Sequence, residues 1–254
     1  MISVAVVAYA ACDMLHEVLG HGLACALIPG VRALSLTTVA LQTSAQSRMV
    51  AAAGSIANVI VGALLFALLR RGTRFDSGKY FLWLLATLNL LNGTGYLLFS
   101  GILDVGDWSV VIAGLEPHGV WRAGMALGGI VAYAGVISIS AARMSSWVRD
   151  AQVDRGDVTR LVFPAYVAGG LLLVAGAAVN PIDPSLIFMS GLSSGFGAMA
   201  GLVLVPKAVE RQAPDSSASV AGLRASRAWL IAAIVVAVVF VGVIGRGINF
   251  TSPS

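Results

Sequence analysis

Seven long apolar segments dominate this sequence and restrict what it can fold into. Each is close to the roughly 20 residues that a helix needs to cross a bilayer. Only 11% of the residues are Asp, Glu, Lys or Arg, against roughly 25% in a soluble domain. The sequence therefore predicts an all-α, polytopic bundle of about seven transmembrane helices in a lipid bilayer, over roughly residues 3–28, 48–69, 80–101, 123–142, 160–179, 185–206 and 228–248.

The basic residues are distributed unevenly between these segments. Because cytoplasmic loops carry an excess of Lys and Arg, we expect the basic loops and the amino terminus in the cytoplasm and the carboxyl terminus outside. The basic residues form no stripe with interleaved aromatic residues, so no nucleic-acid partner is expected. We expect a multi-pass protein of the plasma (inner) membrane of a prokaryote. Most of the 16 lysines and arginines follow the second, fourth and sixth segments: Arg70, Arg71, Arg74, Lys79, Arg143, Arg149, Arg155, Arg160, Lys207, Arg211, Arg224 and Arg227.

Two stretches between the apolar segments have patterns of their own. In residues 32–46, leucines alternate loosely with Ser and Thr, which predicts a short membrane-embedded β-like segment of one or two strands. Such a strand must be buried in protein or line a wet cavity, because lipid offers its edge no hydrogen bonds. Residues 100–121 are too polar to span, and we expect them at the membrane interface, anchored by Trp108 and Trp121.

The first apolar segment contains an unusual run of ionisable residues, "LHEVLGHG", with His16, Glu17 and His21. Ionisable groups inside a span are costly and mark functional sites; the alternative is a simple hydrogen bond within a helix bundle. A five-residue spacing places the two imidazoles on different faces of a regular α-helix. A π-type turn or a local break at Gly20 would realign them.

Aligned in this way, both imidazoles would ligate one zinc ion. Glu17 would then lie beside the metal, where it can take a proton from the bound water. Because catalytic zinc commonly keeps three protein ligands, a third is expected in the segment after the third span. Asp107 is preferred there and Asp104 is the alternative, whereas Glu116 and His118 are interpreted as parts of a solvated loop.

Two polar residues near this motif have two interpretations each. Asp13 precedes His16 by about one helical turn, so it either orients that ring or is a plain helix-surface carboxylate. Asn58 in the second segment either orients substrate or catalytic groups, or bonds across helices.

The third apolar segment adds four polar residues. Asn89 and Asn92 are expected to be buried amides that need hydrogen-bond partners. Thr94 and Tyr96 are interpreted as packing residues between helices.

Three stretches together resemble the site-2 protease family of intramembrane zinc metalloproteases, over roughly residues 10–110. "HEVLGHG" is similar to the family's H-E-x-x-H helix, and "AGSIANVIVG" resembles its G-P-x-x-N pattern, with Ser55 in place of Pro. "NLLNGTGYLLFSGILDVGDW" resembles its third core helix, which ends in an Asp ligand. The longer histidine spacing is similar to the H-E-x-x-G-H motif of the dipeptidyl peptidase III zinc enzymes.

The resemblance implies a three-helix catalytic core that cleaves a transmembrane peptide. Zinc would be held by His16, His21 and an aspartate at 107 or 104, with Glu17 as the general base. The β-like segment would hold an unwound substrate by strand addition. The expected organisation is a catalytic core with its interfacial segment at 1–121, accessory helices at 122–206, a polar linker at 207–227, and a terminal helix and tail at 228–254.

Two other functions compete with this interpretation. One is a seven-span zinc lipid hydrolase similar to the ceramidase and adiponectin-receptor group, although the paired histidines of that group lie in late spans. The other is a non-enzymatic transporter or metal-permeation protein in which His16, Glu17 and His21 line a path. The sequence does not define an oligomeric state.

Overall fold

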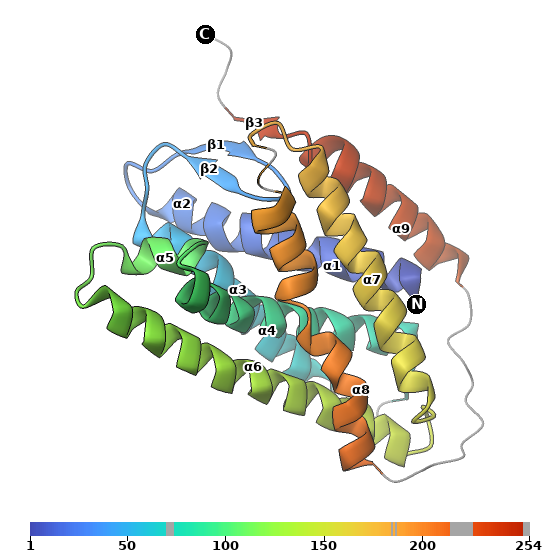
Figure 1. Ribbon diagram of the computed structural model, residues 1–254. Helices are drawn as coiled ribbons and strands as arrows, with labels where there is room; N and C mark the ends of the chain where they lie inside the picture. Colours follow the sequence, from blue (N-terminus) through green and yellow to red (C-terminus); the bar gives the residue numbers. More distant parts are fainter. Residues whose placement is uncertain (70–73, 184, 186, 214–225, 251–254) are drawn as a thin grey trace.

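The computed structural model describes residues 1–69, 74–183, 185, 187–213 and 226–250 (Figure 1). Within these residues, seven helices are long and apolar enough to cross a membrane, the same number as the predicted apolar segments. They fit a multi-pass membrane protein. Arg70, Arg71 and Arg224, which contributed to the charge pattern, lie outside the described residues. The seven helices are Ile2–Leu27, Arg48–Leu68, Ser77–Leu103, His118–Arg149, Asp157–Ala178, Ser190–Gln212 and Arg227–Ile244.

Several of these helices are composites of α-helical and π-helical parts. The helical elements are α1 (Ile2–Met14), π-helix η1 (Leu15–Gly22), α2 (Leu23–Leu27), α3 (Arg48–Leu68), α4 (Ser77–Leu103), α5 (Asp107–Ile112), α6 (His118–Arg149), α7 (Asp157–Ala178), π-helix η2 (Ile187–Gly197), α8 (Gly201–Gln212), α9 (Arg227–Val239) and π-helix η3 (Phe240–Ile244). The strands are β1 (Ala33–Leu36), β2 (Leu41–Thr43) and β3 (Ile248–Asn249).

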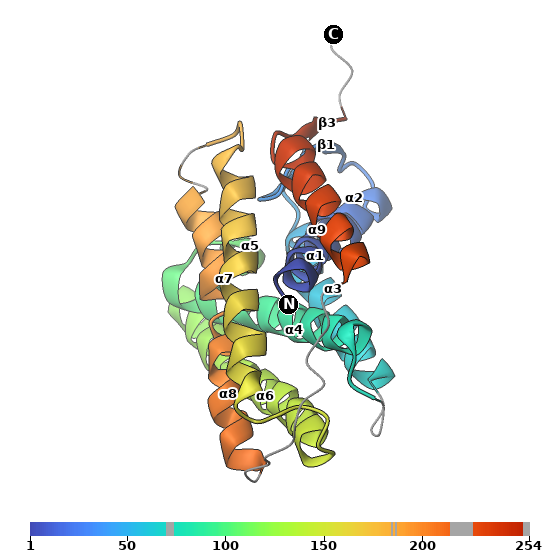
Figure 2. The ribbon, with the colours of Figure 1, turned by 90° about the vertical axis from the view of Figure 1, so that its right-hand side faces the viewer.

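Helix α4 is the centre of the arrangement. It packs against α1, α3 and α6 and is the most buried of the seven spans. Helices α7 and α9 pack on α1, while α8 lies against α6 and α7, as the two views together show (Figures 1 and 2). The first three spans therefore pack against one another. The last three spans cover part of their surface.

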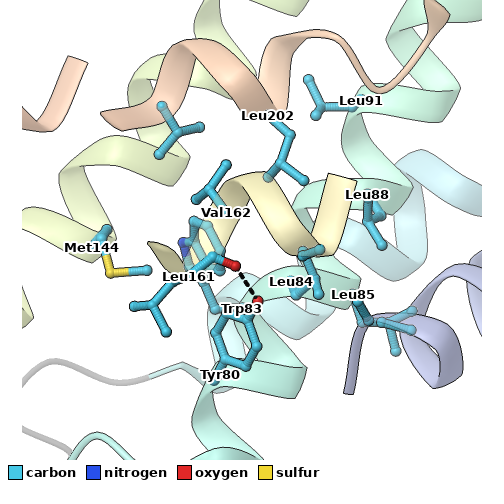
Figure 3. Packing of buried hydrophobic residues seen from close by; sticks show 14 of the residues in the cluster. Tyr80, Trp83, Leu84, Leu85, Leu88, Leu91, Met144, Leu161, Val162 and Leu202 are labelled. Atoms are coloured by element: carbon cyan, nitrogen blue, oxygen red, sulfur yellow. Dashed lines mark hydrogen bonds between the residues drawn. The ribbon is translucent and has the colours of Figure 1, made fainter. Parts of the chain in front are cut away.

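The large apolar side chains of α4 form the main core (Figure 3). Trp83 and Leu88 of α4 are fully buried, and the core cluster also includes Met144 of α6 and Leu202 of α8. Two polar bonds reinforce this packing. The Tyr80 hydroxyl donates to the Leu161 carbonyl at 2.7 Å, and Trp83 Nε1 donates to the Ser140 carbonyl at 3.1 Å. Because hydrogen bonds between apolar helices add to close packing, they orient α4 relative to α6 and α7.

A small three-stranded sheet lies at one end of the bundle (Figure 1). β1 and β2 lie within residues 32–46, where one or two strands are predicted, and they pair antiparallel as a hairpin. β3, near the end of the described chain, pairs with the other edge of β1, so the strand order is β2-β1-β3. Nothing in the sequence predicted β3, because its two residues pair with a strand more than two hundred positions away.

The tip of the hairpin is fastened to the end of α7. Asn180 Nδ2 donates to Thr37 Oγ1 at 3.2 Å. Thr38 is buried, and a Cβ atom at Gly176 would lie 2.8 Å from its Oγ1. These contacts hold the hairpin tip against the end of α7, which packs on the first span.

Candidate metal centre

The five-residue spacing of the two histidines is accommodated by the π-helix η1. Its wider turn, with hydrogen bonds from i to i+5, brings residues five apart onto one face. The Nε2 atoms of His16 and His21 lie 3.1 Å apart. The predicted distortion is therefore confirmed, and it extends over the whole motif rather than over Gly20 alone.

Asp107 joins the two histidines at the start of α5. Its Oδ2 lies 3.0 Å from Nε2 of His16 and 3.4 Å from Nε2 of His21. Gly106, at φ +81°, makes the turn that points Asp107 inward. Arg48 donates to the carbonyl of Ala113, which ties the far end of α5 to the start of α3.

The charge environment of Asp107 favours its ionised form. Burial by itself raises the pKa of a carboxyl group. When the rings of His16 and His21 are protonated, their hydrogen bonds and charges outweigh burial and lower the pKa of Asp107 below its ordinary value. The carboxylate is consequently available as an anionic ligand.

Hydrogen bonds on the far side of each ring indicate which nitrogen carries the proton. Nδ1 of His21 donates to the Val50 carbonyl at 2.7 Å, and Nδ1 of His16 donates to Asn58 Oδ1 at 2.6 Å. A neutral imidazole with its proton on Nδ1 has a lone pair on Nε2. Three electron-rich atoms, two Nε2 and one carboxylate oxygen, therefore face one another and require a positive centre between them, a proton or a metal ion.

The donor set matches a metal site. The ligand atoms of His16, His21 and Asp107 all lie within 4.8 Å of one another, so this group could hold a metal ion. Nδ1 hydrogen bonds to a carbonyl or amide oxygen are the usual support of metal-binding histidines. The structure gives this supporting role at His16 to Asn58 and not to Asp13.

Glu17 lies beside these three residues on the wall of a cavity of about 170 Å³. The same cavity is lined by His21, Tyr96 and Asp107. The hairpin contributes Val39, Ala40, Leu41 and Thr43 to its wall. Glu17 is only 5% exposed, and its Oε2 has no hydrogen-bond partner among the residues that the structure describes. A buried, unpartnered carboxylate oxygen next to a polar cavity is suited to bind a water molecule or a proton.

Tyr96 is a site residue that the sequence interpretation missed. Its ring stacks on the ring of His16, with centroids 4.9 Å apart and planes inclined by 29°. It also lines a second cavity of about 180 Å³, which lies between α4 and η2 and shares Val39 and Asp107 with the first. Asn89, Asn92 and Tyr96 lie on one face of α4 because they are spaced by three and four residues. This spacing is the sequence signal that would have placed Tyr96 near the buried amides.

Asp104, the alternative third ligand, lies outside this centre and has a different role. It ends α4 in the left-handed conformation at φ +57°. Its Oδ2 accepts from His118 Nε2 at 2.9 Å and lies 3.8 Å from Nη1 of Arg122. The side chains of Asp104 and His118 are about one-third exposed. Their hydrogen bond connects the end of α4 to the start of α6. Glu116 accepts from the His118 backbone N–H at 3.2 Å.

In comparisons with known proteins, no family model, no curated protein and no solved structure matches the chain. Fold and site alone therefore define its class. The part of the chain that the structure describes is mostly helical, with seven helices long and apolar enough to span a membrane, a small sheet, and a candidate metal centre of two histidines and one aspartate.

Proposed function

We propose that this chain is an intramembrane zinc metallopeptidase similar to the site-2 protease family. One observation carries the proposal: the Nε2 atoms of His16 and His21 converge on Oδ2 of Asp107 beside a cavity that Glu17 also lines. Two imidazoles and a carboxylate are the ligand types of hydrolytic zinc sites, which keep one position open for water or substrate.

The chain's own residues supply the remaining requirements. A zinc ion held by His16, His21 and Asp107 would contribute a Lewis acid and lower the pKa of a bound water. Glu17, whose buried Oε2 has no hydrogen-bond partner among the described residues, would act as the general base for a water molecule in the cavity and would return the proton to the leaving amine. The cavity walls restrict bulk water around Glu17, since the residue is almost fully buried.

The hairpin offers a way to hold a peptide substrate. β1 is paired on both sides, whereas β2 forms an edge of the sheet. Leu41 and Thr43 of β2 line the cavity that contains Glu17. A segment of a transmembrane substrate that unwinds and adds to β2 would present its backbone carbonyls along this cavity. Strand addition suits a protease better than a lipid hydrolase, because lipids have no backbone to pair.

The test compares Glu17→Gln with Glu210→Gln, an exposed glutamate of α8 that serves as the matched control. The purified full-length chain is assayed for bound zinc and for cleavage of a transmembrane peptide. We expect Glu17→Gln to retain zinc and to lose about 10²- to 10⁴-fold in cleavage rate, and the control to behave like the wild type. Cleavage that survives Glu17→Gln would contradict the proposed role.

Two parallel assays separate the competing functions. Hydrolysis of a ceramide in place of the peptide would favour a lipid hydrolase. Zinc flux into vesicles without hydrolysis of either substrate would favour a metal-permeation protein. Either result would overturn the peptidase proposal.

A further inference from the structure

We propose that Asn89 is a positioning residue that determines which nitrogen of His16 faces the metal centre, acting through the amide of Asn58. The inference deepens the proposed function and rests on its metal site. Asn89 is fully buried in α4 and is not one of the residues grouped at the metal centre.

The orientation of Asn89 is set by the backbone of its own helix. Its Nδ2 donates to the carbonyl of Leu85 at 2.8 Å. A carbonyl oxygen can only accept, so the amide nitrogen must lie on that side. The Oδ1 of Asn89 therefore points the other way, where it accepts from Asn58 Nδ2 at 2.8 Å.

The orientation of Asn58 follows from that bond. Its Nδ2 also lies 3.3 Å from the carbonyl of Cys12, a second group that can only accept. With both acceptors on the Nδ2 side, Oδ1 faces Nδ1 of His16 at 2.6 Å. His16 must then donate from Nδ1, which leaves a lone pair on Nε2, the atom closest to Asp107.

A reversed Asn58 amide would have the opposite effect. Its oxygen would face Oδ1 of Asn89 and the carbonyl of Cys12, which are mutually repulsive contacts in a fully buried place. Its nitrogen would donate to Nδ1 of His16, and the imidazole proton would move to Nε2. An Nε2 that carries a proton cannot bind a metal ion, so Asn89 opposes this arrangement by favouring the observed one.

The first experiment measures zinc affinity of the purified full-length chain by competition with a chromophoric chelator. We expect Asn89→Leu to bind zinc about 10- to 100-fold more weakly than the wild type, as is typical when support of a ligating histidine is lost. Thr87→Val is the matched control: Thr87 is also fully buried in α4, but its hydroxyl bonds to Trp83 and Ser140. We expect this control to bind zinc like the wild type.

A rescue variant separates positioning from a merely structural role. A carboxylate has no N–H, so aspartate at position 58 can only accept from Nδ1 of His16, whichever way it is turned. We expect Asn58→Asp combined with Asn89→Leu to bind zinc more tightly than Asn89→Leu alone, even though its second carboxylate oxygen faces the carbonyl of Cys12. A structural role for Asn89 predicts the reverse, because the double variant buries an additional charge.

Each outcome decides something. Unchanged affinity in Asn89→Leu, an equal loss in Thr87→Val, or no recovery in the double variant would overturn the role of Asn89. A wild-type chain that binds no zinc would overturn the role and the metal site together, whereas one that binds zinc without cleaving peptides would overturn the peptidase proposal alone. If Asn89→Leu does not fold, Asn89→Ala, which removes the amide without added volume, provides the same comparison.

Discussion

The backbones of Gly20 and Gly54 touch: a Cβ atom at position 20 would lie 2.4 Å from Cα of Gly54. Only glycine tolerates this separation, which brings η1 against α3 in the way small residues allow between membrane helices. The contact also brings α3 within reach of the histidine rings, so that Asn58 and the Val50 carbonyl can bond to Nδ1 atoms of η1.

The first prediction concerns Gly54→Ala. The added Cβ would lie 2.6 Å from Nε2 of both His16 and His21, closer than real Cβ contacts. The rings must move apart, so we expect zinc affinity to fall by more than about 10-fold in the chelator competition. Unchanged zinc binding would show that these nitrogens do not form the centre.

Gly62→Ala is the control on the same helix. Its Cβ would lie 2.7 Å from Cγ of Leu90, far from either histidine. Overpacking of this kind lowers the free energy of unfolding by roughly 1–3 kcal/mol. We expect a lower melting temperature with unchanged zinc affinity, which separates a packing defect from a displaced ligand.

The first span shows how far the sequence determines the structure. The five-residue spacing of His16 and His21 predicts a π-type turn or a break, because a metal site needs both rings on one face of the helix. The amides of α4 carried no comparable signal. Whether Asn89 bonds to Asn58 or elsewhere depends on how two helices pack, and one sequence does not specify that pairing.

The third ligand illustrates the same limit at short range. Asp104 and Asp107 are three residues apart and were hard to distinguish by sequence. The backbone separates them: α4 ends at Asp104 in the left-handed conformation, and the positive φ of Gly106 reverses the chain before Asp107. The turn, and not the residue type, selects the carboxylate that reaches the histidines.

The second prediction follows from this separation. We expect Asp107→Asn to lose most of the roughly one zinc ion per chain that a single site holds, because a neutral amide replaces the anionic ligand. Asp104→Asn should keep its zinc and change the free energy of unfolding by less than about 1 kcal/mol, as for partly exposed ion pairs. Metal analysis and thermal unfolding of both variants check this, and the reverse pattern would exchange the roles of the two aspartates.

The third prediction tests the hairpin as a substrate-holding element. A side chain at Gly176 would press on Thr38 at the hairpin tip and on Phe240 of η3. We expect Gly176→Leu to raise KM for a transmembrane peptide by roughly 10-fold while kcat changes by less than about twofold, the pattern of lost substrate binding. Zinc content should be unaltered. Gly128→Ala, in α6 with no atom within 4 Å of its added Cβ, is the control; a fall in kcat at constant KM would argue against the role.

The last prediction concerns the extra residue of the motif. Five residues of a π-helix turn through about the angle that four cover in an α-helix, so removing one residue from η1 converts it to α-helix without rotating its ends against each other. Leu19 is 42% exposed and makes no part of the centre. We therefore expect the Leu19 deletion to fold and to bind zinc within roughly 10-fold of the wild type.

Deletion of Ala11 from the regular helix α1 is the control: it rotates Tyr9 by about 100° away from Gly169 of α7 and should abolish folding. Loss of zinc in the Leu19 deletion, with the fold retained, would mean that the centre needs the π-helical backbone itself and not only the alignment of its two histidines.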